Sequence, residues 1–102
     1  MLKIKDNIDL KELEKFGFKY VEWNYDHEYG FFPKLYVKDM WKDNKWTHKV
    51  NIIIDTKDRF IDIRNGKDFR LLTSKQAENK YLSDLINAGL VEKVEEEWKK
   101  LH

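Results

Sequence analysis

The spacing of hydrophobic and polar residues changes twice along the chain and divides it into three regions. Up to residue 17, and again after residue 73, apolar residues recur every three to four positions, which is typical of amphipathic helices. Between these regions apolar and polar residues alternate, which is typical of strands. The pattern therefore predicts a domain in which helices at both ends of the chain accompany a β-sheet.

A short first helix is expected over residues 10–16. It is preceded by Asp9, whose carboxylate can accept hydrogen bonds from the free N–H groups of the first turn, and Glu12 completes a capping box. Gly17 follows directly and can adopt the left-handed conformation that ends many helices. Both ends of this helix are thus marked in the sequence.

Two further helices are expected near the C-terminus. The first begins after Thr73 or Ser74, either of which can act as its N-cap, and it ends at Gly89. The second covers about residues 90–101, where apolar residues again form a helical stripe. Within it, 91–94 also fits a short strand, and the sequence leaves these two alternatives open.

Five strands are predicted between the helices. They are expected at 18–25, 31–38, 46–54 and 59–64, with the fifth after the turn at Asn65-Gly66. Pro33 lies inside the second of them and indicates an edge position, because proline cannot donate a hydrogen bond to a neighbouring strand.

Side-chain pairing predicts the register of the last hairpin. A turn with one extra residue places Ile63 opposite Phe69 and Ile61 opposite Leu71. A strict two-residue turn would place both isoleucines opposite charged residues. A bulged turn is therefore predicted.

The order of these elements predicts the fold class α+β: an antiparallel five-stranded meander sheet with a short N-terminal helix and two C-terminal helices on one face. With 102 residues, the chain is expected to form a single domain over 1–102. Because the helices cover one face of the sheet, the other face is left to solvent or to a partner.

The net charge and the small number of arginines bear on whether the protein binds nucleic acid. Twenty Lys and Arg against nineteen Asp and Glu give a net charge of +1, so the molecule has no overall field that would attract a polyanion. Only three of the cations are Arg, the side chain that binds phosphate and guanine in a bidentate manner. Both observations argue against sequence-specific DNA binding.

The expected cellular compartment follows from three features that the sequence lacks. It contains no cysteine, which excludes disulfides and thiol catalysis. No apolar run approaches the roughly 20 residues of a membrane span, and the first residues do not form a signal peptide. A cytoplasmic location without membrane contact is therefore expected.

Aromatic residues are concentrated in 16–46, which holds eleven of the fifteen. Trp and Tyr dominate the energetics of many protein interfaces. Seven are predicted to form a partner-binding surface: Trp23, Tyr25, Tyr29, Phe31, Tyr36, Trp41 and Trp46. The alternative is that most of these rings pack in the core or across strands, since strands favour aromatic residues.

A second hypothesis assigns the same region to single-stranded nucleic acid. Its aromatic rings would stack on bases while five lysines follow the phosphates: Lys34, Lys38, Lys42, Lys45 and Lys49. The near-zero net charge and the neighbouring Asp39 and Asp43 argue against it.

No metal or cofactor site is predicted. The three histidines, His27, His48 and His102, lack the spacing with which helices present metal ligands or a general base. Glycine-rich phosphate loops and nucleophile motifs are also missing from the sequence.

One short segment resembles part of an enzyme signature. Asp55-Thr56-Lys57, at the end of an apolar strand, is similar to the second half of the PD-(D/E)xK nuclease motif, in which Asp39 or Asp43 would supply the first acid. The predicted meander conflicts with the parallel core of that class, and 55–58 fits a turn. The chain is therefore predicted not to be an enzyme.

Two stretches resemble small uncharacterised proteins of phages and prophages of low-GC Gram-positive bacteria: Ile4–Phe18 and Ala88–Lys93. Together they cover about a fifth of the chain. The resemblance implies an accessory role that is exerted by binding a host protein, and it maps no functional residue onto this sequence.

The leading hypothesis is a non-enzymatic binding module that blocks a host protein, for example a defence protein, through its aromatic-rich surface. Single-stranded nucleic-acid binding is the alternative. A homo-oligomer that uses the open sheet face or edge is the third hypothesis.

Overall fold

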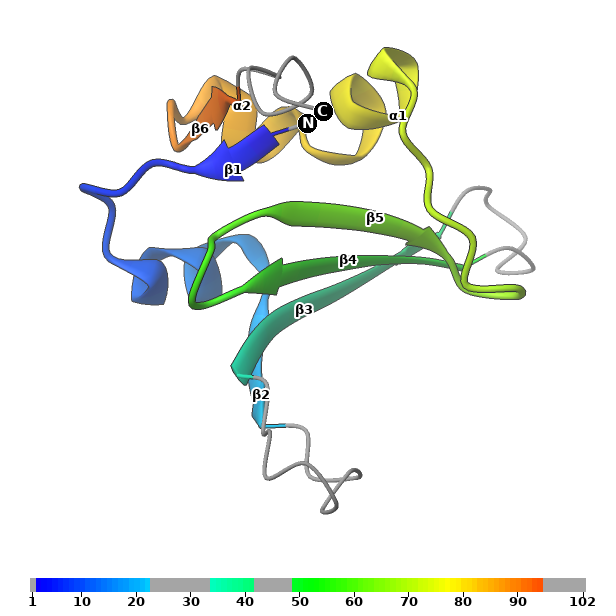
Figure 1. The fold of residues 1–102 in the computed structure, drawn as a ribbon, viewed down its shortest axis with the longest axis horizontal. Coiled ribbons are helices and arrows are strands. Elements are labelled where there is room, and N and C mark those ends of the chain that lie inside the picture. The colour runs from blue at the N-terminus through cyan, green and yellow to red at the C-terminus, as the bar shows by residue number, and fades with distance from the viewer. Residues whose placement is uncertain (1, 23–33, 42–48, 95–102) are drawn as a thin grey trace, which may run out of the picture.

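Four strands form one antiparallel meander, as expected from the alternating pattern. The computed structural model describes residues 2–22, 34–41 and 49–94, and for Trp41 its backbone only. The sheet has the order β2-β3-β4-β5. Its strands are β2 (Lys19–Glu22), β3 (Lys34–Trp41), β4 (Lys49–Asp55) and β5 (Ile61–Asn65), as Figure 1 shows. Consecutive strands are therefore neighbours throughout this sheet.

The prediction of one five-stranded sheet is wrong, because the chain forms two sheets. The second has two antiparallel strands, β1 (Leu2–Ile4) and β6 (Val91–Lys93), which come from opposite ends of the described chain. Figure 1 shows this pair together with the two α-helices on one side of β5. The strand alternative for 91–94 is thus the correct one over Val91–Lys93.

The expected fifth strand of the meander does not form. After β5 the chain makes a wide turn in which Phe69 has a positive φ of 58°, and only Arg64 and Leu71 then form an isolated bridge. The N–H of Leu72 donates to the carbonyl of Ile63 at 2.7 Å. The predicted pairing of Ile63 with Phe69 is wrong because the turn is longer than a one-residue bulge allows.

The first helix lies where the sequence predicts it, but it is a 3₁₀-helix, η1 (Leu10–Phe16). The Asp9 side chain accepts a hydrogen bond from the N–H of Lys11 at 3.0 Å, and Gly17 ends the helix in the left-handed region with φ 91°. The Asp9 cap and the Gly17 stop are therefore confirmed, whereas the Glu12 half of the predicted capping box is not, because the Glu12 carboxylate accepts from Lys15 at 2.9 Å.

The first C-terminal helix is divided in two. Ser74 caps α1 (Lys75–Tyr81) by accepting from the N–H of Ala77, and α2 (Ser83–Asn87) follows after a break at Leu82. The second helix predicted there is wrong in its first residues, which form β6. Its remainder from residue 95 lies outside the described residues.

The predicted edge position of the second strand is also wrong. β3 covers Lys34–Trp41, and Pro33, on which that prediction rested, lies outside the described residues. β3 lies between β2 and β4 and pairs with both. The edges of the sheet are β2 and β5.

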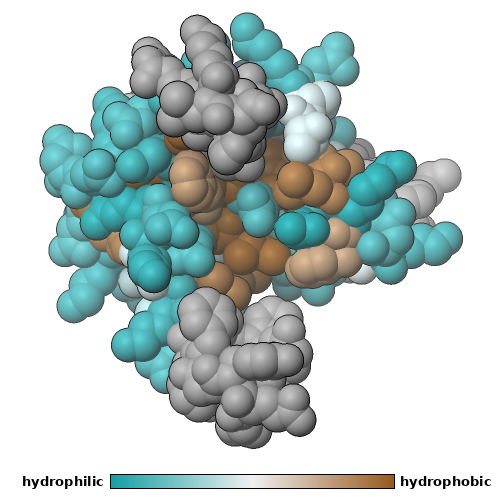
Figure 2. Space-filling model, viewed as in Figure 1, coloured by the Kyte–Doolittle hydropathy of each residue, from teal (hydrophilic) through white to brown (hydrophobic). Residues whose placement is uncertain are grey.

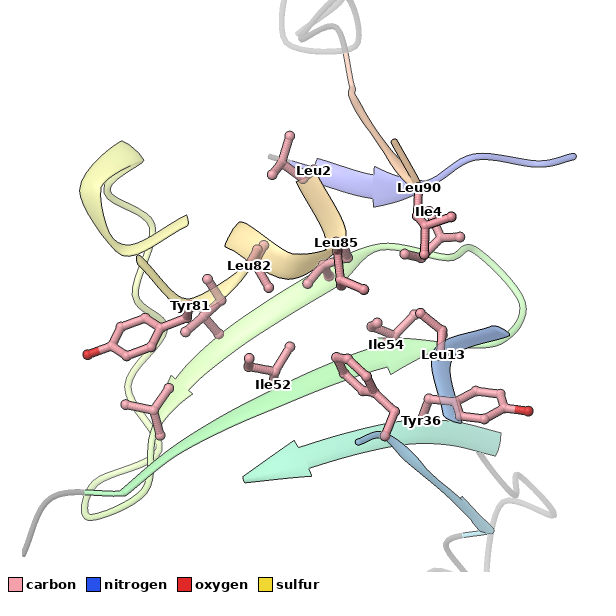
Figure 3. Packing of buried hydrophobic residues seen from close by; sticks show 14 residues of the cluster. Leu2, Ile4, Leu13, Tyr36, Ile52, Ile54, Tyr81, Leu82, Leu85 and Leu90 are labelled. Atoms are coloured by element: carbon pink, nitrogen blue, oxygen red, sulfur yellow. The ribbon is translucent and has the colours of Figure 1, made fainter. Parts of the chain in front are cut away.

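One face of the sheet forms the core. Alternate residues of β4 and β5 are buried, namely Val50, Ile52, Ile54, Ile61 and Ile63. They pack against side chains of the first strand and of the helices, including Ile4, Leu13, Leu82 and Leu85 (Figure 3). Full burial of one such side chain stabilises the fold by about 1.5–3 kcal/mol.

The opposite face of the sheet carries the residues between these core positions. Pairing places Val37, Ile53 and Asp62 in one row across β3, β4 and β5, and Leu35 beside Asp55 in the next row. Ile53 is half-buried and Leu35 is buried, so this outer face has an apolar centre with acidic neighbours.

Candidate partner-binding groove

A groove of about 950 Å³ extends from the outer face of the sheet to the edge strand β5 and helix α1. Volumes of this order are typical of binding sites for small ligands and peptide segments. The groove draws on β3, β4, β5, the segment 71–73 and α1, so elements that are distant in sequence meet in it.

The described lining of the groove is mainly apolar. Its apolar residues are Leu35, Ile53, Phe60, Ile61, Ile63, Leu71, Leu72 and Val94, and Thr73 also lines it. Over β4 and β5, Figure 2 shows an apolar area with hydrophilic residues on both sides. Such a surface favours a partner that brings apolar side chains of its own.

Four carboxylates accompany these apolar residues: Asp55, Asp58, Asp62 and Glu78. Among the described lining residues no Lys, Arg or His is present. The groove is therefore locally acidic, although the chain as a whole has a net charge of +1.

A tight turn fixes one end of the groove. The Asp55 carboxylate accepts hydrogen bonds from the N–H groups of Lys57 at 2.6 Å and of Asp58 at 3.3 Å. The N–H of Arg59 donates to the carbonyl of Asp55 at 2.9 Å, which closes the turn. The same residues thus shape the backbone and place Asp58 and Phe60 at the groove.

Phe69 is an exposed aromatic residue near the groove in sequence, with 48% of its surface accessible, but it is not one of the described lining residues. The guanidinium of Arg64 lies 5.0 Å from the centre of the Phe69 ring, and its Nη2 lies 3.6 Å from the carboxylate of Asp62, which lines the groove. Leu71, two residues further along, also lines the groove.

The backbone of Phe69 is energetically costly. A φ of 58° is uncommon for any residue other than glycine or asparagine and costs about 1–3 kcal/mol for a bulky side chain. The Phe69 ring is not part of the hydrophobic core. Sequence reasoning missed this residue because it assigned Phe69 to the fifth strand.

Tyr36, one of the predicted partner-binding residues, lies in the core and is 6% exposed. Burial raises the pKa of its phenol, and the negative charges of Glu14 and Asp9 raise it further. Its ring packs edge-to-face on Tyr20, with 5.5 Å between centroids. Tyr20 is the neighbour that is accessible, at 45% exposure.

Partial burial likewise raises the pKa of Tyr20, and the nearby Glu22, which accepts a hydrogen bond from the phenol at 3.1 Å, adds to the effect. Both phenols are therefore neutral at physiological pH. They act as apolar rings that carry a hydroxyl group.

The other predicted aromatic residues lie largely beyond the described chain. For Trp41, at the end of β3, only the backbone is described. Five fall outside the described residues: Trp23, Tyr25, Tyr29, Phe31 and Trp46.

Three of the five lysines in the nucleic-acid hypothesis are described, and their surroundings differ. Lys34 is exposed at the start of β3, and Lys49 lies 3.0 Å from the carboxylate of Asp39. The Nζ of Lys38 lies 5.7 Å from the Phe18 ring centre and 3.9 Å from Asp84. Lys42 and Lys45 fall outside the described residues.

The two described acids of the nuclease-like segment are far apart. Leu35 is opposite Asp55, so Asp39 lies four residues further along β3, or about 13 Å away at the rise of a strand. Asp39 instead pairs with Asn51 and Lys49. Within 2–22, 34–41 and 49–94, no three His, Asp or Glu side chains lie close enough together to hold a metal ion.

Comparison with protein-family models, with curated protein sequences and with solved structures found no match to this chain. The resemblance to phage proteins thus stays a prediction. None of the helices in the described part of the chain is long and apolar enough to cross a membrane.

Proposed function

We propose that the protein is a non-enzymatic binding module that holds a segment of another protein in the groove beside β5. The observation that carries this proposal is the state of Phe69, whose ring contacts Arg64, the ion-pair partner of the groove residue Asp62. Its ring is exposed and its backbone conformation is unfavourable, yet the ring contributes nothing to the core. Strain of this kind concentrates at binding sites, and exposed aromatic residues are frequent anchors of protein interfaces.

The geometry of the groove supports a peptide segment over a globular surface. Its lining comes from six separate parts of the chain and is concave, so a partner must enter it rather than lie flat on it. Arg64 contacts both the Phe69 ring and the carboxylate of the lining residue Asp62, so a segment that leaves the groove beside Asp62 can pack on Phe69.

The proposal can be tested with a displayed library of random dodecapeptides and the full-length protein as bait. We expect enriched peptides whose affinity falls at least about tenfold in Phe69→Ala, the usual loss for a central aromatic anchor. Tyr20→Ala is the matched control, because Tyr20 is equally exposed but lies on β2, away from the groove. Its affinity should stay within about twofold.

Two results would refute this function. One is the absence of any enriched peptide in selections with the unmodified protein. The other is an equal loss of affinity in both variants, which would place the contact outside the groove. Circular dichroism of each variant confirms that it is folded before its affinity is compared.

Single-stranded nucleic acid is a second candidate, and one specific observation favours it. In the sequence, the exposed Phe69 lies between Lys67 and Arg70, which are also exposed, and aromatic rings next to cations bind unpaired bases. Fluorescence anisotropy with labelled single strands should then show affinity that falls steeply with salt. The carboxylates of the groove oppose such a ligand.

A further inference from the structure

We infer that the segment held in the groove is a basic one, in which Lys or Arg residues flank apolar residues. This inference rests on the proposed function and names the chemistry of the partner. It follows from the charges of the described lining, which holds four carboxylates and no cationic side chain. Complementary charge is the usual means by which an interface selects its partner.

The arrangement of the carboxylates sets the pattern of the partner. Asp55 and Asp58 lie at the turn between β4 and β5, whereas Glu78 belongs to α1 on the other side of the groove. The groove lining that contains these acids also includes the apolar residues Leu35, Ile53 and Leu72. A bound segment therefore needs apolar side chains for the floor and cations that reach outward on both sides.

Three of the four carboxylates are suited to pairing with a partner. Within the described residues, neither Asp58 nor Glu78 forms an ion pair, whereas Asp62 has Arg64 at 3.6 Å. Asp55 uses one oxygen for its turn and keeps the other for a ligand. A cation that enters an apolar groove is partly desolvated, so each pair is stronger there than on an open surface.

The dodecapeptide library also tests this inference. We expect the enriched peptides to carry Lys or Arg beside apolar residues, and to bind more weakly as salt rises. The double variant Asp58→Asn/Glu78→Gln should weaken the best peptide about tenfold and reduce its dependence on salt. Glu14→Gln is the matched control, since it removes an exposed carboxylate on η1, outside the groove.

The outcomes separate the inference from the function on which it rests. Peptides that need Phe69 but show no enrichment of cations, or that bind the double variant as tightly as the unmodified protein, overturn the basic partner and leave the binding function standing. A selection that yields no peptide overturns both.

A dimer mass in light scattering, with no release of monomer by the peptide, would assign the groove to a second copy and overturn the inference. Preferential binding of single-stranded DNA that Phe69→Ala abolishes would overturn it in favour of the second candidate.

Discussion

The turn that joins β4 to β5 (55–60) and the turn after β5 (65–70) are built in the same way. In each, the first residue is Asp or Asn, and its side-chain oxygen accepts a hydrogen bond from the N–H two positions later, at 2.6 and 3.1 Å. In each, the fifth residue donates to the carbonyl of the first, at 2.9 and 2.8 Å, and has a positive φ, 65° and 58°. The two backbones therefore carry the same strain.

The fifth residues of the two turns differ in what they contact. In the first turn it is Arg59, whose Nη1 donates to the backbone carbonyls of Lys5 and Ile8 at 2.8 and 2.7 Å. In the second it is Phe69, whose ring is exposed to solvent beside Arg64. The strain of the first turn is offset by contacts that fasten the N-terminal segment to the sheet. The second turn has a local contact only, in which Nη1 of Arg64 donates to the carbonyl of Phe69 at 3.1 Å, and it fastens no distant segment to the sheet.

This difference indicates which turn serves the fold and which serves binding. A costly conformation persists where the structure around it, or the function of the protein, requires it. Arg59 meets the first condition through its two hydrogen bonds. The ring of Phe69 makes no contact in the core, and this contrast is the reason that the binding proposal involves the second turn.

The largest expected effect is on stability and concerns the first turn. Arg59→Ala should lower the free energy of unfolding by about 3 kcal/mol, because two part-buried carbonyls lose a charged donor. Arg59→Gly should lower it by about 2 kcal/mol, since glycine relieves the positive φ. Urea denaturation followed by tryptophan fluorescence measures both.

Arg70→Ala is the control for this prediction, because it removes an exposed arginine from the equivalent turn. Its effect should stay within about 0.5 kcal/mol. If Arg59→Ala is as mild as Arg70→Ala, the two turns are not divided between fold and binding.

The second expected effect concerns the second residue of each turn, which is Thr56 in the first turn and Gly66 in the second. Both donate their N–H to a carbonyl of a neighbouring strand, at 3.1 and 2.8 Å. A Cβ on Gly66 would lie 2.8 Å from the carbonyl oxygen of Lys49, so Gly66→Ala should cost about 2 kcal/mol in unfolding experiments. Thr56→Ala loses one exposed hydrogen bond and should cost about 1 kcal/mol or less. The reverse order would mean that the two turns have different backbones.

The sequence predicted the parts of the fold that depend on local chemistry. Asp9, Gly17 and Ser74 each mark an end of a helix, and each acts there through hydrogen bonds or backbone geometry within a few residues. The alternation in β4 and β5 likewise predicted their buried face. Such signals are readable because their cause lies next to them in the chain.

Contacts between distant segments were not predictable in this way. β1 and β6 have three residues each and lie at opposite ends of the described chain, so neither has a period that could reveal the other. The fifth strand failed because Leu71-Leu72 ends the alternation and Ser74 then begins a helix. The residues beyond a turn thus decide whether a strand or a helix succeeds it.

The groove was not predicted from the sequence. The density of aromatic residues predicted a partner-binding surface before residue 47, whereas the described exposed aromatic residues include Phe69. The sequence does hold one signal, a four-residue motif that occurs at 55–58 and again at 65–68. It consists of Asp or Asn, then any residue, then Lys and Asp. It identifies a repeated turn, but only the structure shows that one copy exposes its strained side chain.

The third expected effect is the sign of a change in stability, which should differ between the two turns. Phe69→Gly should leave the free energy of unfolding unchanged or raise it by up to about 1 kcal/mol, because relief of the positive φ outweighs the exposed contact with Arg64. Arg59→Gly, the same change in the equivalent position, should lower it. Thermal and urea unfolding of the two variants side by side give the answer. A loss above about 1 kcal/mol in Phe69→Gly would show that the ring supports the fold and is not held for a partner.

The smallest expected effect separates the two tasks of Asp55, which caps its turn and lines the groove. Asparagine performs the same capping in the second turn, so Asp55→Asn should change the free energy of unfolding by less than about 0.5 kcal/mol. It removes a negative charge from the groove, however, and should weaken a basic peptide about threefold. The exchanged variant Asn65→Asp, which adds a charge outside the groove lining, should leave the peptide affinity within about twofold. Isothermal titration with one selected peptide compares the three proteins, and equal affinities would confine Asp55 to its structural role.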